Sequence, residues 1–215
     1  MHKIVKNLIM SDLFILGGLG LIQPVFAIFL LENIAYSSVL AVGIATSIQL
    51  VTKAILQIMI GRWTDAEKGN RRELYSLISG SVIISLVPFS YIFATNISHI
   101  YIIQLFYGLG SALAFPGWMV VFSQYLRRDR LGYEWSVYST VMSLGTAAAA
   151  SLGAYIADFY SFKVLFVIVG LLSVLGTGFV VSVFKHEFIR IRHQESEESS
   201  NQQIKMSFED SQKNK

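Results

Sequence analysis

The chain has 215 residues, of which 53% are hydrophobic and 14% are charged, and its formal net charge is +3. An ordinary soluble domain carries about 25% charged residues, so this composition argues against one. The absence of cysteine excludes disulfides and thiolate metal sites.

Six apolar stretches follow one another, separated by short segments in which the charges cluster. They predict transmembrane helices at about 11–32, 38–60, 74–95, 99–124, 134–158 and 162–184, because a helix needs about 20 apolar residues to cross a bilayer. A β-barrel would need strands of alternating polarity, and these stretches do not alternate. We therefore expect an all-α membrane protein, with residues 1–187 forming one six-helix transmembrane domain.

The stretch at 11–32 has the basic flank of a signal peptide, because Lys3 and Lys6 precede it. Its apolar part is too long for a signal peptide, and no small-x-small cleavage site precedes Glu32. We expect a retained first helix, in which Gln23 is a candidate polar contact.

The second stretch carries a polar stripe. Thr46, Gln49, Lys53 and Gln57 recur at helical spacing, so they share one face of an otherwise apolar span. Such a face should meet a water-filled cavity or another helix rather than lipid. Lys53 is the only ionisable residue that the predicted boundaries place deep in a span. It is either a cavity contact or a lysine that reaches back to the cytoplasmic surface, and the flanking glutamines favour the cavity.

The fourth stretch places Gln104, Tyr107 and Trp118 at helical spacing among several glycines. A packing seam with a kink at Pro116 is the other interpretation of this pattern. We predict a cavity between the helices. Its candidate contacts are Gln23, Gln49, Lys53, Gln104, Tyr107 and Trp118.

The basic residues of the loops lie almost entirely on one side of the predicted membrane. The loops on the opposite side contain one basic residue, Lys163. This asymmetry predicts a multi-pass protein of the cell membrane with both termini cytoplasmic. It accounts for the positive net charge without a nucleic-acid partner. The tail at 188–215 is polar, with an acidic run, and is predicted to be disordered.

Signals of catalysis are weak. The sequence has no G-x-S-x-G elbow, no H-E-x-x-H pair and no Walker loop, and its histidines lie at ends or in loops. We therefore expect no catalytic residues, no metal, no cofactor and no enzyme activity.

The loop after the second stretch reads GRWTDAEKGNRREL. It resembles the G-x-x-x-D-R-x-G-R-R signature of the Major Facilitator Superfamily, which lies between the second and third helices on the cytoplasmic side. Ala66 stands where the signature has its first arginine, and the second glycine comes one residue late. The resemblance implies a gating loop that latches the outward-open state. Its residues here would be Gly61, Asp65, Gly69, Arg71 and Arg72, with Gly61 allowing close helix contact.

The fourth stretch contains QLFYGLGSALAFPGW. It resembles the family pattern R-x-x-x-G-x-G-x-x-x-x-x-P, with Gln104 where an arginine is often found. A full member of this family has about twelve helices in two six-helix halves that are parallel repeats. The resemblance covers one half.

This resemblance implies a transporter of a small solute that works by alternating access. An even number of helices lets two copies insert in the same orientation, so a homodimer, or a pair with a second half, would restore the full arrangement. The alternative is a non-transporting membrane subunit that assembles with another membrane protein. The sequence does not identify the solute. It also does not identify a coupling ion, since no acidic residue is predicted deep in a span.

Overall fold

The structure, a computed structural model, describes residues 3–66 and 71–213, with side-chain surroundings as far as residue 190. It contains seven α-helices and one 3₁₀ turn, and no strand within these ranges. The elements are α1 (Lys3–Ile22), α2 (Phe26–Asn33), α3 (Val39–Asp65), α4 (Arg71–Ile92), α5 (Ile97–Tyr125), η1 (Arg128–Arg130), α6 (Leu131–Phe159) and α7 (Phe162–Lys213).

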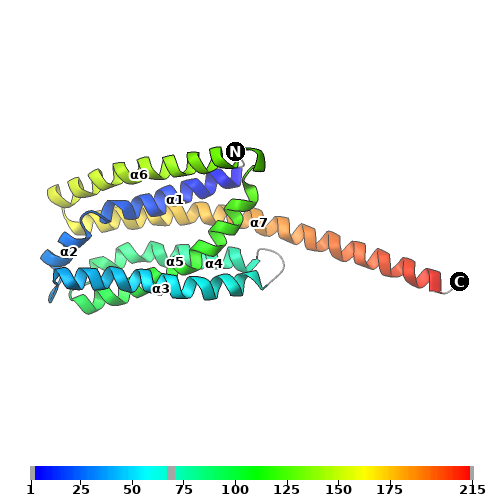
Figure 1. Cartoon of the computed structure of the whole chain (residues 1–215), viewed down its shortest axis with the longest axis horizontal. Helices are drawn as coiled ribbons and strands as arrows, with labels where there is room; N and C mark the ends of the chain where they lie inside the picture. Colours follow the sequence, from blue (N-terminus) through cyan, green and yellow to red (C-terminus); the bar gives the residue numbers. More distant parts are fainter. Residues whose placement is uncertain (1–2, 67–70, 214–215) are drawn as a thin grey trace.

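All of these helices except α2 are long and apolar enough to cross a membrane, which confirms the predicted set of six spanning helices. They pack as two layers, one of α1, α6 and α7 and the other of α3, α4 and α5 (Figure 1). Contacts between α4 and α7 join the layers. The N-terminus lies at the same end of the bundle as the connection from α5 to α6.

The first predicted helix differs from the observed one. The stretch at 11–32 is divided into α1, which begins at Lys3, and the short α2, with a turn at residues 23–25. Pro24 explains the break, because proline has no backbone N–H to donate to the carbonyl four residues earlier. The N–H of Val25 donates instead to the carbonyl of Ile22, at 3.0 Å.

The earlier start of α1 corrects one expectation about charge. Asp12 lies inside the helix and is 9% exposed, so Lys53 is not the only ionisable residue within a span. A predicted start near residue 11 had placed Asp12 at the helix end, where a carboxylate would be unremarkable.

The last helix also differs from the prediction. Instead of ending near 184 before a disordered tail at 188–215, α7 continues to Lys213 and projects beyond the bundle (Figure 1). Buried Glu187 anchors the first part of this continuation, because Tyr125 of α5 donates a hydrogen bond to it and an Arg190 nitrogen lies 2.8 Å from it. The tail beyond is rich in glutamate, glutamine and lysine, which have good helix propensity.

Hydrogen bonds between helices stabilise the bundle where lipid would leave polar groups unmatched. Ser85 of α4 donates to the carbonyl of Ser173 at 3.0 Å, and its hydroxyl lies 2.6 Å from that of Thr177, both on α7. Ser76 of α4 donates to the carbonyl of Leu113 of α5 at 2.7 Å. Such bonds between membrane helices contribute about 0.6 kcal/mol each on average.

A close contact between α4 and α5 depends on Gly117. A Cβ atom at this position would meet the carbonyl oxygen of Glu73, so only glycine allows the two backbones to approach in this way. Gly43 of α3 is a useful contrast, because a Cβ atom there would meet no atom of the described chain within 4 Å.

We expect Gly117→Ala to lower the melting temperature of the purified protein, because over-packing of this kind destabilises by about 1–3 kcal/mol. Gly43→Ala is the matched control and should not lower it, since alanine favours helix over glycine. Equal melting temperatures for the two variants would contradict the close packing at Gly117.

Candidate functional site

A cavity of about 520 Å³, here the main cavity, lies between α1, α3, α5 and α6. Four of the six predicted contacts line it: Gln23, Gln49, Gln104 and Tyr107. Gln104 is buried, and its Nε2 donates to the hydroxyl of Tyr91 at 3.3 Å, which holds the amide in place. None of the described residues that line the main cavity is charged, so the cavity suits neutral polar groups.

A second cavity of about 250 Å³, here the charged pocket, contains the other two predicted contacts, Lys53 and Trp118. Leu16 and Tyr138 line both cavities, so the two are neighbours. Lys53 is half-buried, and its Nζ lies 5.2 Å from the centre of the Phe115 ring. The six predicted contacts are therefore divided between two adjacent cavities.

Sequence reasoning missed two residues of the charged pocket, Asp12 and Tyr138. The Tyr138 hydroxyl on α6 donates a hydrogen bond of 2.9 Å to Asp12 Oδ2 on α1. Asp12 could have been found as a single acid within a long apolar run. No local pattern marks Tyr138, because its partner is 126 residues away in the chain.

The predicted gating loop connects three helices through its arginines. Arg72 at the start of α4 donates from its Nη1 to the carbonyl of Trp63, at 3.1 Å, and its guanidinium lies 5.3 Å from the centre of the Trp63 ring. Arg71 lies 5.5 Å from the ring centre of Phe188 on α7. A cation at the carbonyl end of α3 is favourable because that end carries partial negative charge.

The other loop residues are less engaged within the described chain. Asp65 is exposed at the end of α3. A Cβ atom at Gly61 would meet no described atom within 4 Å, which corrects the expectation of a close helix contact there as far as the described residues are concerned. The expectation failed because a motif identifies a small residue but not its neighbour. Gly69 lies outside the described residues.

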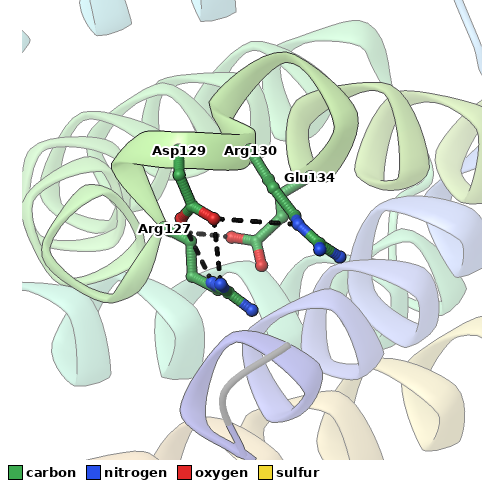
Figure 2. Close-up of polar contacts among 4 residues, drawn as sticks. All are labelled: Arg127, Asp129, Arg130 and Glu134. Atoms are coloured by element: carbon green, nitrogen blue, oxygen red, sulfur yellow. Dashed lines mark hydrogen bonds and ion pairs between the residues drawn. The ribbon is translucent and has the colours of Figure 1, made fainter.

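The connection between α5 and α6 is a compact ionic turn (Figure 2). The Arg127 guanidinium donates to both oxygens of Asp129, at 3.2 and 2.9 Å, and Arg130 Nε lies 3.7 Å from Asp129 Oδ2. The buried Glu134 side chain accepts from the backbone N–H of Arg127 at 3.0 Å. The bond to Glu134 connects this turn to the first part of α6, and Tyr138 lies one helical turn further along the same helix.

Within the part of the chain that the structure describes, no group of three or more histidine, aspartate or glutamate side chains could hold a metal ion. The polar chemistry of the site consists of amides, hydroxyls, one carboxylate and one ammonium. This set can bind and orient a solute through hydrogen bonds and charge.

Comparisons with known proteins agree with this architecture. The family model described as Major Facilitator Superfamily matches residues 8–210. The chain is 23% identical over 172 residues to an uncharacterized MFS-type transporter of Methanocaldococcus jannaschii, covering 80% of this chain and 42% of the relative. It is 26% identical over 145 residues to a multi-drug resistance efflux pump PmrA homolog of Lactococcus lactis, covering 67% of this chain and 34% of the relative.

The backbone is also similar to that of a solved structure. The POT family transporter PepTSo matches with a TM-score of 0.71 and 16% identity, over 86% of this chain and 38% of that chain. The chain thus spans less than half the length of each of these proteins.

We expect Tyr138→Phe to lower the melting temperature, because it removes the hydrogen bond between α6 and α1 and leaves Asp12 without that donor. The free energy of unfolding should fall by about 0.6–1.7 kcal/mol, from the average to the maximum measured for such bonds in membrane helices. Tyr155→Phe, an exposed tyrosine on the same helix, is the matched control and should leave the melting temperature unchanged. Equal effects of the two substitutions would count against the bond.

Proposed function

We propose that this chain, which belongs to the Major Facilitator Superfamily, moves a small solute across a membrane by alternating access. It is a multi-pass membrane protein. The observation that carries the proposal is the polar main cavity of about 520 Å³ among apolar spanning helices. Polar side chains at membrane depth are costly unless they face water, a ligand or one another, so they mark solute pathways.

A second six-helix unit would complete the site. The two least covered spanning helices are α3 and α6. In each of them 11% of the most apolar segment is buried inside the protein, against 39–56% in the other four. Both helices also contribute polar residues to the main cavity, among them Gln49 and Thr146. Lipid against this side would leave polar groups unmatched, whereas a second unit would cover them. The relatives, of which the chain spans 42% and 34%, are long enough to contain two such units.

The second unit in this proposal is another copy of the chain, in the same orientation, with both termini cytoplasmic. The basic loops support this orientation, because lysine and arginine are concentrated in cytoplasmic loops. The gating loop then faces the cytoplasm. Arg72 would hold the ends of α3 and α4 together. Gly61, beside which no described atom would meet a Cβ, would be available to the partner copy.

Alternating access can be tested by thiol labelling of an introduced cysteine, which does not require the solute to be known. The chain has no cysteine of its own, so labelling has no background. A single cysteine replacing Gln49 should react with a membrane-impermeant maleimide added to either side of oriented vesicles. Leu86→Cys, an exposed apolar position on α4, is the control and should react from neither side. Labelling of Gln49→Cys from one side only would contradict the mechanism.

The dimer can be tested by native mass spectrometry of the full chain in lipid nanodiscs, where we expect twice the chain mass of 24.0 kDa. A cysteine at Val51 on the uncovered side of α3 should also cross-link two copies through a short bismaleimide, whereas Leu86→Cys should not. A strict monomer without cross-linking would refute the homodimer.

A further inference from the structure

Two opposite charges line the charged pocket without pairing. Asp12 comes from α1 and Lys53 from α3. No ion pair joins them in the part of the chain that the structure describes. Opposite charges that share an apolar site normally pair, because a buried charge without a counter-charge is costly. Each charge is therefore placed for a partner from outside the chain.

Neutral neighbours hold both charges in position. The Tyr138 hydroxyl donates to one oxygen of Asp12 at 2.9 Å, and the Phe115 ring lies under the Lys53 ammonium at 5.2 Å. A hydroxyl donor and an aromatic face stabilise a charge but do not cancel it. Both charges remain available to a ligand.

Trp118 adds an unsatisfied donor to the same pocket. Its side chain is 8% exposed, and its indole N–H has no hydrogen-bond partner among the described residues. A buried N–H without an acceptor costs about 1–3 kcal/mol. An acceptor oxygen on a ligand would remove this cost, and a carboxylate could accept from Lys53 and Trp118 together.

The size of the pocket limits the ligand. About 250 Å³ is below the roughly 300–1,000 Å³ of sites for drug-sized molecules, so the solute must be compact. Ile84 and Val180 are among the apolar side chains that line the pocket and would suit an apolar substituent. The pocket selects by charge as well. A simple cation would face Lys53 and a simple anion would face Asp12, so each would leave a repulsive contact.

We infer that the charged pocket binds a small zwitterion of the amino-acid type, with its carboxylate at Lys53 and Trp118 and its ammonium at Asp12. This inference rests on the proposed function and names the chemical class of the transported solute. A zwitterion pairs both charges and satisfies the indole N–H, which neither a cation nor an anion alone can do. The main cavity adjoins the pocket and has no charged side chain among the described residues that line it, so it then serves as the neutral approach to the pocket.

The test is a binding measurement on the full chain in lipid nanodiscs. Radiolabelled L-alanine, L-leucine and L-phenylalanine supply zwitterions with side chains of three sizes. Leucinamide, which lacks the carboxylate, and N-acetyl-leucine, which lacks the ammonium, serve as competitors. We expect at least one zwitterion to bind, and both competitors to be weaker than leucine by about tenfold or more, the effect of losing one charge-assisted hydrogen bond.

Two substitutions should change this selectivity in opposite directions. Asp12→Asn should weaken zwitterion binding by about tenfold or more and reduce the difference in affinity between leucine and N-acetyl-leucine. Lys53→Met should weaken zwitterion binding similarly and reduce the difference in affinity between leucine and leucinamide. Asp158→Asn and Lys163→Met, exposed residues outside both cavities, are the matched controls and should leave binding unchanged. A mere loss of folding would not produce opposite changes in selectivity.

Three results would overturn the inference: no zwitterion binds, leucinamide or N-acetyl-leucine binds as tightly as leucine, or neither substitution affects binding. These results are distinct from a failure of the proposed function, because binding in nanodiscs requires no transport. If Gln49→Cys is labelled from both sides and no zwitterion binds, only the inference fails. If a zwitterion binds with the expected selectivity but labelling occurs from one side only, only the transport mechanism fails.

Discussion

A polar group inside a bilayer must be satisfied by the protein itself, and this constraint shapes the whole bundle. Hydroxyls on α4 bond to carbonyls and hydroxyls of α7 and α5, and the Gln104 amide bonds to Tyr91. Polar groups that have no such partner in a neighbouring helix line the cavities. The remaining amides and the two opposite charges lie together between α1, α3, α5 and α6, so the features that hold the helices together and those that could bind a solute have the same physical origin.

The two cavities divide this polar chemistry between them. The main cavity contains neutral amides and hydroxyls, whereas the charged pocket contains one carboxylate and one ammonium. Tyr138 belongs to the wall of both and is bonded to the carboxylate. It lies on α6, whose first part is connected to the preceding ionic turn by the bond from Arg127 to Glu134 (Figure 2).

Hydropathy was sufficient to predict the spanning helices, because the length and apolar character that a bilayer demands are visible in any window of sequence. The polar stripe that contains Gln49 and Lys53 was also visible in the sequence, from the spacing of its residues, and both residues line cavities. Asp12 was missed because hydropathy locates helix ends poorly. An acidic residue at the end of a spanning helix is unremarkable, whereas one inside the span indicates a functional site. The bond between Tyr138 and Asp12, and the absence of any described atom close to a Cβ at Gly61, follow from how distant segments pack, which no local pattern in the sequence records.

The break at Pro24 has an electrostatic consequence. Proline cannot donate to the carbonyl of Gly20, a residue that lines the main cavity. The break also brings the carbonyl end of α1 next to the amide end of α2, and the ends of a helix carry partial charges of about half an electron. The wall of the main cavity around this break is therefore polar although no charged side chain of the described residues lines it, and because this polarity comes from peptide groups it persists unless Pro24 itself is replaced.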